Sequence, residues 1–191
     1  QTDYPIHELL KNRWSPRAFS GRPLEREALL SLFEAARWSP SANNRQPWHF
    51  IVTTPLKAEP YQRMFETLTE RNQSWAKNAP LLVLTVAQRE PEPGKINAKA
   101  LYDLGQAVAH LTVQAGALGL YVRQMGGFDA PRAAENFSLP VGFEPVTVLA
   151  VGYLGSPDVL PEHFRQAEFE ARARKPQAEF VFDGAWGVAL D

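Results

Sequence analysis

The chain of 191 residues is long enough for one domain with a substantial core, and its 45% hydrophobic and 21% charged content is ordinary for a globular protein. A formal net charge of -1 gives no electrostatic reason to expect nucleic acid or a membrane surface as a partner. The absence of cysteine excludes disulfides, thiolate metal sites and a cysteine nucleophile.

The first residues, Gln1–Pro5, lack the basic and apolar segments of a signal peptide. No apolar run in the sequence reaches the length that spans a membrane. We therefore expect a cytoplasmic protein made of a single domain, 1–191.

Predicted helices and strands alternate along the chain, but the strands are few. Apolar residues at helical spacing predict helices, and short apolar runs between turn-forming residues predict strands. The predicted helices cover 6–12, 25–38, 56–68, 98–118 and 131–136. The predicted strands cover 50–53, 81–86, 120–123 and 146–151, and 179–182 is a strand-like tail that needs a partner. In the first helix we expect Leu9 and Leu10 to face inward, and in the third we expect a break near Pro60.

Two common phosphate-binding motifs are missing from the sequence. Neither Gly-x-Gly-x-x-Gly nor Gly-x-x-x-x-Gly-Lys-Ser/Thr occurs, which argues against a Rossmann or P-loop site. The four histidines, at 7, 49, 110 and 163, are not at metal-ligand spacing, so we expect no metal site.

Arg13, Ser15 and Arg17 place two cations and a hydroxyl within five residues, just after the first predicted helix. One guanidinium can bind phosphate oxygens through two hydrogen bonds, while the other can reach an electron-rich ring carbonyl. The alternative is a solvated basic turn without a ligand. Seen together with the loop that follows the second predicted helix, the pattern favours a phosphorylated ligand.

That loop is rich in small hydrogen-bonding side chains. It contains Pro40, Ser41, Ala42, Asn43 and Gln46, and it leads into a predicted buried strand. So much polarity beside a buried strand is costly unless a ligand contacts it, so the loop indicates a ligand cradle. The alternative is an Asn-rich loop that only ends a helix.

Together, Arg-x-Ser-x-Arg-x-Phe at 13–19 and Pro-Ser-Ala-Asn-Asn-Arg-Gln-Pro-Trp at 40–48 resemble the FMN-dependent nitroreductase family. The resemblance extends from about Ile6 to Gly187. It implies an α+β three-layer sandwich with a mainly antiparallel central sheet flanked by helices. It also implies a homodimer with FMN at the interface and a C-terminal arm that reaches the partner subunit.

The resemblance assigns the phosphate end of the flavin to basic residues from both ends of the chain. Arg13 would contact the phosphate or ribityl chain, and Arg172 and Arg174 would bind the phosphate. Arg17 would lie beside the N1–C2 carbonyl edge of the ring, where a cation stabilises the charge of the reduced form. Trp14 would contribute backbone contact only.

For the flavin ring, the resemblance points to two further segments. Gln124, Met125, Gly126 and Gly127 would lie under the ring, with the backbone N–H of Gly126 directed at N5. Asn72 would meet the pyrimidine edge, although a role as a helix cap is an equal alternative. The cradle loop at 40–46 would complete the partner's site, with Ala42 standing where many relatives have a hydroxyl.

The implied activity is hydride transfer from NADH or NADPH through flavin N5 to a nitroaromatic, a quinone or a similar flat acceptor, in a ping-pong cycle. No side chain is assigned a proton-transfer role; Arg17 and the backbone of Gly126 would tune the flavin. The alternatives are a nitroreductase-fold enzyme with another flavin reaction, such as dehydrogenation or reductive removal of a substituent, and a non-catalytic flavin-binding carrier or sensor.

Overall fold

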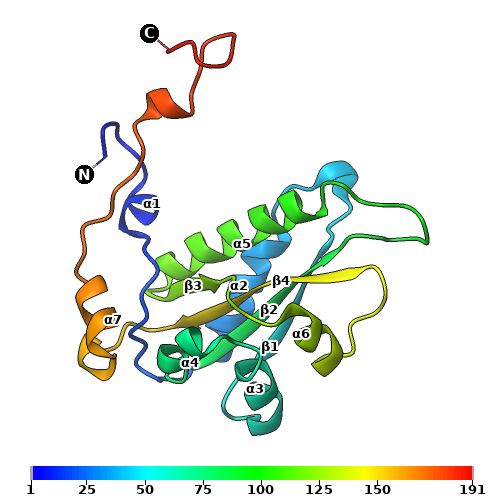
Figure 1. Cartoon of the computed structure of the whole chain (residues 1–191), viewed down its shortest axis with the longest axis vertical. Helices are drawn as coiled ribbons and strands as arrows, with labels where there is room; N and C mark the ends of the chain where they lie inside the picture. The colour runs from blue at the N-terminus through cyan, green and yellow to red at the C-terminus, as the bar shows by residue number, and fades with distance from the viewer. Residues whose placement is uncertain (1, 191) are drawn as a thin grey trace.

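An antiparallel sheet of four strands, in the order β1-β2-β4-β3, forms the middle of residues 2–190, which the computed structural model describes (Figure 1). The strands are β1 (Trp48–Thr53), β2 (Leu81–Gln88), β3 (Tyr121–Met125) and β4 (Phe143–Gly152). The α-helices are α1 (Glu8–Asn12), α2 (Arg26–Arg37), α3 (Ala58–Phe65), α4 (Glu70–Ala76), α5 (Ala100–Ala117), α6 (Ala130–Asn136) and α7 (Glu162–Ala167). Short 3-10 helices are η1 (Ala42–Asn44), η2 (Pro157–Val159) and η3 (Gln177–Glu179).

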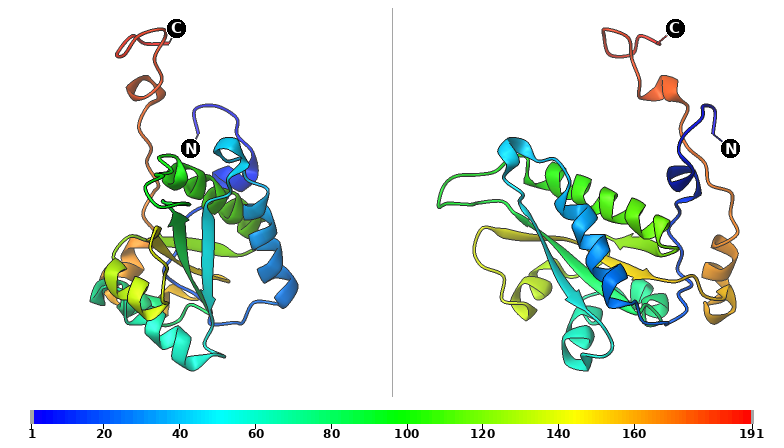
Figure 2. Two further views of the ribbon diagram at one scale, coloured as in Figure 1. Left: turned by 90° about the vertical axis from the view of Figure 1, so that its right-hand side faces the viewer. Right: turned by 180° about the vertical axis from the view of Figure 1, so that it is seen from behind.

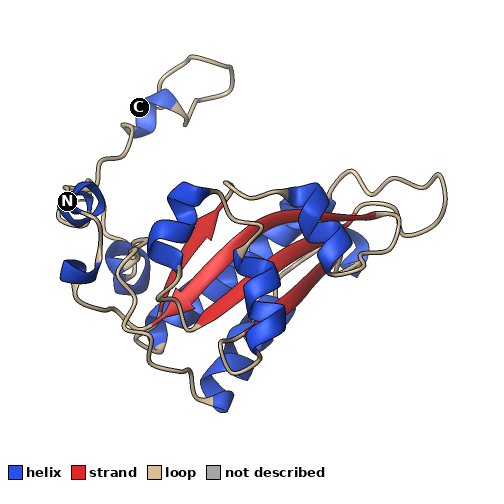
Figure 3. Ribbon diagram, turned by 60° about the horizontal axis from the view of Figure 1, so that its bottom comes forward, coloured by secondary structure: helices blue, strands red, loops and turns tan. Residues whose placement is uncertain are grey.

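The central strand β2 explains why helices cover the sheet on both faces. All of its residues except the last are buried. Successive side chains of a strand point to opposite faces, so a continuous apolar strand needs cover on both. One core contains Leu82, Leu84 and Val86, and the other contains Leu81, Val83 and Ala87. The resulting order of helix, sheet and helix confirms the predicted three-layer sandwich (Figure 3).

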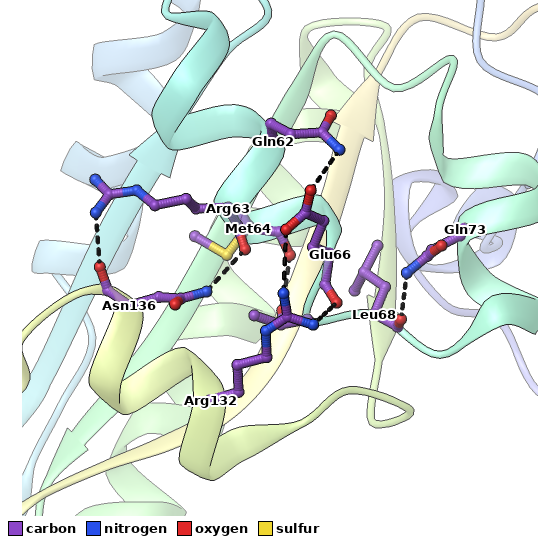
Figure 4. Close-up of polar contacts among 9 residues, drawn as sticks. Gln62, Arg63, Met64, Glu66, Leu68, Gln73, Arg132 and Asn136 are labelled. Atoms are coloured by element: carbon purple, nitrogen blue, oxygen red, sulfur yellow. Dashed lines mark hydrogen bonds and ion pairs between the residues drawn. The ribbon is translucent and has the colours of Figure 1, made fainter.

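Helices α2 and α5 cover one face of the sheet, while α3, α4 and α6 lie on the other (Figures 1 and 3). On the second face, Arg132 of α6 binds both the carbonyl and the carboxylate of Glu66, each at 3.1 Å (Figure 4). Arg63 and Asn136 donate to each other's carbonyl groups at 3.1 and 3.2 Å. No helix within residues 2–190 has the length and apolar content needed to cross a membrane.

The C-terminal segment leaves the body of the protein after α7. Figures 1 and 2 show residues after 168 running past α1 and away from the sheet. We call residues 169–190 the arm. Several of its apolar side chains are exposed, among them Phe180 at 60% and Trp186 at 91%.

Three local predictions are wrong. The tail at 179–182 is not a strand; η3 occupies part of it, and Phe182 forms an isolated bridge with Ala189 in a terminal loop. Leu10 is 51% exposed and does not face inward, because α1 is a short surface helix. Pro60 breaks no helix, since it lies in the first turn of α3, where the missing N–H costs no hydrogen bond.

The N-terminal segment lies against the chain that follows β4, and this contact positions Arg17. Ser20 N donates to the carbonyl of Tyr153 at 3.0 Å, and Gly155 N donates to that of Ala18 at 2.9 Å. A Cβ on Gly155 would lie 2.6 Å from the carbonyl carbon and oxygen of Phe19. Glycine is therefore required where the two backbones approach.

We expect Gly155→Ala to lower the free energy of unfolding by about 1–3 kcal/mol, because the added methyl group overlaps the Phe19 backbone. Urea unfolding of the purified protein measures the change.

Gly105→Ala is the matched control. Its Cβ would lie within 4 Å of no atom of the described residues outside its own helix, in the interior of α5. We expect that variant to gain about 0.5–1 kcal/mol from the higher helix propensity of alanine. Equal stability of the Gly155 variant and the wild type would contradict the backbone contact.

Candidate functional site

Two cavities of about 340 and 290 Å³ adjoin at the point where the N-terminal segment, β3 and α7 meet. Arg17 and Arg123 line both cavities, so we treat the two as one groove and call it the arginine groove. Its α4 end is lined by Thr69, Arg71, Asn72, Trp75, Gln124, Met125, Gly126, Gly127 and Phe164. Its arm end is lined by Arg13, Trp14, Ser15, Ala167, Glu168, Glu170, Ala171, Arg172 and Arg174.

At the arm end, the structure brings together Arg172 and Arg174, predicted to bind phosphate, and Arg13, predicted to contact the phosphate or the ribityl chain. Burial lowers the pKa of Arg13, and the positive charges of Arg174 and then Arg172 lower it further. Arg13 donates to Ser15 Oγ at 3.2 Å, while Arg172 donates to the carbonyl groups of Arg13 and Lys11 at 2.6 and 3.0 Å. Within residues 2–190 none of these three arginines forms an ion pair, so together they form a positive site without a bound carboxylate.

Trp14 also lines the arm end, and its ring meets Tyr121 edge-on with centroids 6.0 Å apart. The side chain therefore packs against β3. The assignment of backbone contact alone to this residue stays a prediction.

Arg17 is held by Glu168, a residue that belongs to none of the predicted motifs. The Glu168 side chain is 2% exposed, and its carboxylate accepts the N–H of Arg17 at 3.0 Å and that of Ala18 at 3.3 Å. It also lies 3.5 Å from Nη1 of Arg17. One carboxylate thus fixes both the backbone and the guanidinium of Arg17 in the groove.

Arg123 of β3 is a second residue that the motifs missed. Its Nη1 donates to the carbonyl of Ser15, and its guanidinium lies 5.4 Å from the ring centroid of Trp75. Burial lowers the pKa of Arg123 to about 10; the charges of Arg17 and Arg71 lower it too, and Glu168 raises it. With a pKa of about 10 the side chain stays protonated at neutral pH, so a second cation faces the middle of the groove.

At the α4 end, Asn72 is hydrogen-bonded directly to the loop that contains Gly126 and Gly127. Asn72 lies inside α4, whose N-cap is Thr69, so the helix-cap alternative is wrong. Asn72 Nδ2 donates to the carbonyl of Gly127 at 2.9 Å, and Thr69 N donates to the same oxygen at 3.1 Å. A Cβ on Gly127 would lie 3.0 Å from Asn72 Nδ2, which only a glycine avoids.

The same loop offers a free backbone donor to the groove. The N–H of Gly126 donates to no group among the described residues, whereas Gly126 and Gly127 both line the cavity. Of the two residues before them, Gln124 is exposed and Met125 is buried in the core. The α4 end therefore presents an unpaired N–H beside cationic side chains.

The cradle loop lies elsewhere. Pro40, Ser41, Ala42, Asn43 and Gln46 line no part of the groove. Ala42 N donates to Asp103 Oδ2 at 3.1 Å in the first turn of α5, and Gln46 N donates to Ser41 Oγ at 3.0 Å.

The N-terminal segment that carries Arg13 lies at the opposite end of α5 (Figures 1 and 2). Helix α5 has 18 residues, which corresponds to a length of about 27 Å. Within one chain the cradle loop and the groove are therefore far apart.

The comparisons with known proteins agree on one family. A family model described as the nitroreductase family matches residues 10–71. A solved structure described as an oxidoreductase containing FMN is 35% identical, has a TM-score of 0.92, and covers 98% of this chain and 96% of its own. A nitroreductase family protein from Clostridium difficile 630 is 28% identical, with a TM-score of 0.73 and coverage of 95% and 99%.

Two relatives were also found by sequence. An uncharacterised protein of Mycolicibacterium smegmatis is 35% identical over 123 residues, which are 64% of this chain and 82% of that protein. A Methanothermobacter thermautotrophicus protein, provisionally named NADH dehydrogenase/NAD(P)H nitroreductase, is 28% identical over 154 residues, covering 78% and 76%. With a 35% identical structure matched over nearly its whole length and a fold that agrees throughout, this chain belongs to the nitroreductase family.

Proposed function

We propose that the arginine groove binds FMN and that the protein is an NADH- or NADPH-dependent oxidoreductase acting on flat acceptors such as nitroaromatics and quinones. The observation that carries the proposal is the continuity of the groove. Arg17 and Arg123 join a site suited to a phosphate with a site suited to the edge of a ring. The related structure that contains FMN supports the choice of ligand.

The arm end suits a phosphate. Arg13, Arg172 and Arg174 converge there without a carboxylate partner among residues 2–190, and a bound dianion would relieve their mutual repulsion. The hydroxyl of Ser15, already bonded to Arg13, adds a neutral donor at the same place.

The α4 end suits an electron-rich ring. The unpaired N–H of Gly126 can donate to a ring nitrogen, and Arg17 and Arg123 can offset negative charge that develops on the ring. FMN, when bound, supplies the hydride-accepting and hydride-donating centre of a ping-pong reaction between the nicotinamide donor and the acceptor. The protein binds the ring, orients it and sets the charge around it.

We also propose that the functional unit is a homodimer in which each cradle loop completes the partner's groove. A single chain cannot bring its own loop to its own groove, because the two lie at opposite ends of α5. The exposed Phe180 and Trp186 of the arm give each chain an apolar surface that a second copy would cover.

Apoprotein should bind FMN at micromolar concentration or below, and heat-released cofactor should be FMN and not FAD. Arg13→Gln should weaken FMN binding about tenfold, because it removes a charge-assisted hydrogen bond to the phosphate. Quenching of flavin fluorescence measures the affinity.

Riboflavin lacks the phosphate and is the matched ligand, so its affinity should be the same for wild type and Arg13→Gln. Lys175→Gln is the matched protein control, since Lys175 is exposed and pairs with Glu179 at 3.8 Å. Recovery of FAD would refute FMN as the cofactor, and an equal loss of affinity for riboflavin and for FMN in Arg13→Gln would refute the phosphate site.

Arg17→Ala should lower the reduction potential of bound FMN by about 30–60 mV, because a charge-assisted hydrogen bond acts mainly on the reduced form. Redox titration of both proteins measures the shift. Arg63→Ala, on the outer helix α3, should leave the potential unchanged. An unchanged potential in an Arg17→Ala protein that still holds FMN would remove Arg17 from this role.

Truncation after Ala178 should weaken both dimerisation and FMN retention, since it removes the apolar part of the arm. Light scattering and flavin content of the truncated protein decide the point.

Two point variants sharpen this test of the dimer. Trp186→Ser should shift the protein towards monomer, whereas Leu56→Ser, at a similarly exposed position on the body, should not. A truncated chain that stays dimeric and fully loaded would show that the arm is dispensable. A wild-type monomer with tightly bound FMN would refute the interface.

A further inference from the structure

Arg71 at the α4 end of the groove has a side chain for which the flavin site gives no obvious use. It is exposed, and its guanidinium lies 5.7 Å from the ring centroid of Phe164. Arg17 lies over the same ring at 4.8 Å, so the two arginines share one aromatic support. Within residues 2–190 the Arg71 guanidinium forms no hydrogen bond or ion pair.

The charge of the groove exceeds what FMN can neutralise. Six arginines line its two ends, against the two carboxylates of Glu168 and Glu170. A phosphate monoester contributes roughly two negative charges, so the loaded groove keeps a positive excess. No carboxylate of the described residues lines the α4 end, and Arg71 is close enough to lower the pKa of Arg123.

The three arginines of the α4 end differ in depth. Arg17 has a side chain that is 16% exposed and paired with Glu168, and Arg123 is largely buried and bonded to Ser15. Arg71 alone is exposed, at the mouth of the groove. Arg17 and Arg123 are thus held by polar groups of the protein, whereas the Arg71 guanidinium is left to contact a molecule from solvent.

We propose that Arg71 binds an anionic group of the substrate that stacks at the α4 end, so that the enzyme selects flat substrates bearing a carboxylate or a phosphate. A guanidinium can bind either group through two parallel hydrogen bonds, and the Phe164 ring provides an apolar surface beside that of Arg71. The inference rests on the proposed function and extends it to a substrate class.

Equilibrium binding to the oxidised holoprotein tests the inference without turnover. Titration calorimetry compares 4-nitrobenzoate with 4-nitrobenzamide, which has nearly the same shape but no charge. Wild type should bind the carboxylate about tenfold more tightly, and Arg71→Gln should bind the two ligands equally. Arg63→Gln, which removes an arginine outside the groove, should behave as wild type.

A second experiment identifies which substrate carries the anionic group. NADPH carries a phosphate that NADH lacks, so kcat/KM for the two donors is measured with 4-nitrobenzamide as acceptor. Loss of a preference for NADPH in Arg71→Gln would assign the site to the donor, and loss of a preference for 4-nitrobenzoate would assign it to the acceptor. Either loss supports the inference.

Four other outcomes would overturn it. Holoprotein that reduces 4-nitrobenzamide but prefers neither the charged acceptor nor NADPH, or an Arg71→Gln protein that keeps every such preference of the wild type, would refute the role of Arg71 alone. Weaker FMN binding by Arg71→Gln, with the charge preference intact, would make Arg71 a cofactor ligand. A chain that binds no FMN would refute the proposed function and this inference together.

Discussion

The buried carboxylate of Glu168 connects the two ends of the chain at the arginine groove. It accepts the backbone N–H groups of Arg17 and Ala18 and pairs with the guanidinium of Arg17. Because Glu168 directly follows α7, the position of Arg17 depends on the packing of that helix against the N-terminal segment. A buried carboxylate with this many partners is costly to lose, since each partner would be left without a hydrogen bond.

The strands of the sheet and the helices that pack on it were predictable, because the apolar patterns that indicate them are local in the sequence. The apolar run at 81–86, bounded by Pro80 and a polar stretch, is typical of a strand buried on both faces, and the apolar spacing of the longest helix, with Gly119 just beyond it, predicts α5 closely. The tail at 179–182 shows the limit of such reasoning. Its apolar composition indicates a strand, but strand formation needs a neighbouring strand, and the body of the chain provides none there.

The candidate site was only partly predictable, because several of its contacts join segments that lie far apart in the sequence. Arg13 and Arg17 could be found because they belong to one short motif. Arg123 and Glu168 each look ordinary in their own segments, as a lone cation in a strand and one of two neighbouring acids in a charged tail. Their importance comes from tertiary contacts with Ser15 and Arg17, across more than a hundred residues of sequence.

The cradle loop is already shaped in the isolated chain. Asn43, Asn44 and Gln46 have positive φ angles of 53°, 53° and 49°, which are uncommon for residues other than glycine, although asparagine tolerates them best. Such backbone persists only where its surroundings fix it, here through Asp103 and Ser41. The conformational entropy of the loop is thus lost during folding and not at assembly, so the loop would meet another surface as a rigid wall and not as a mobile lid.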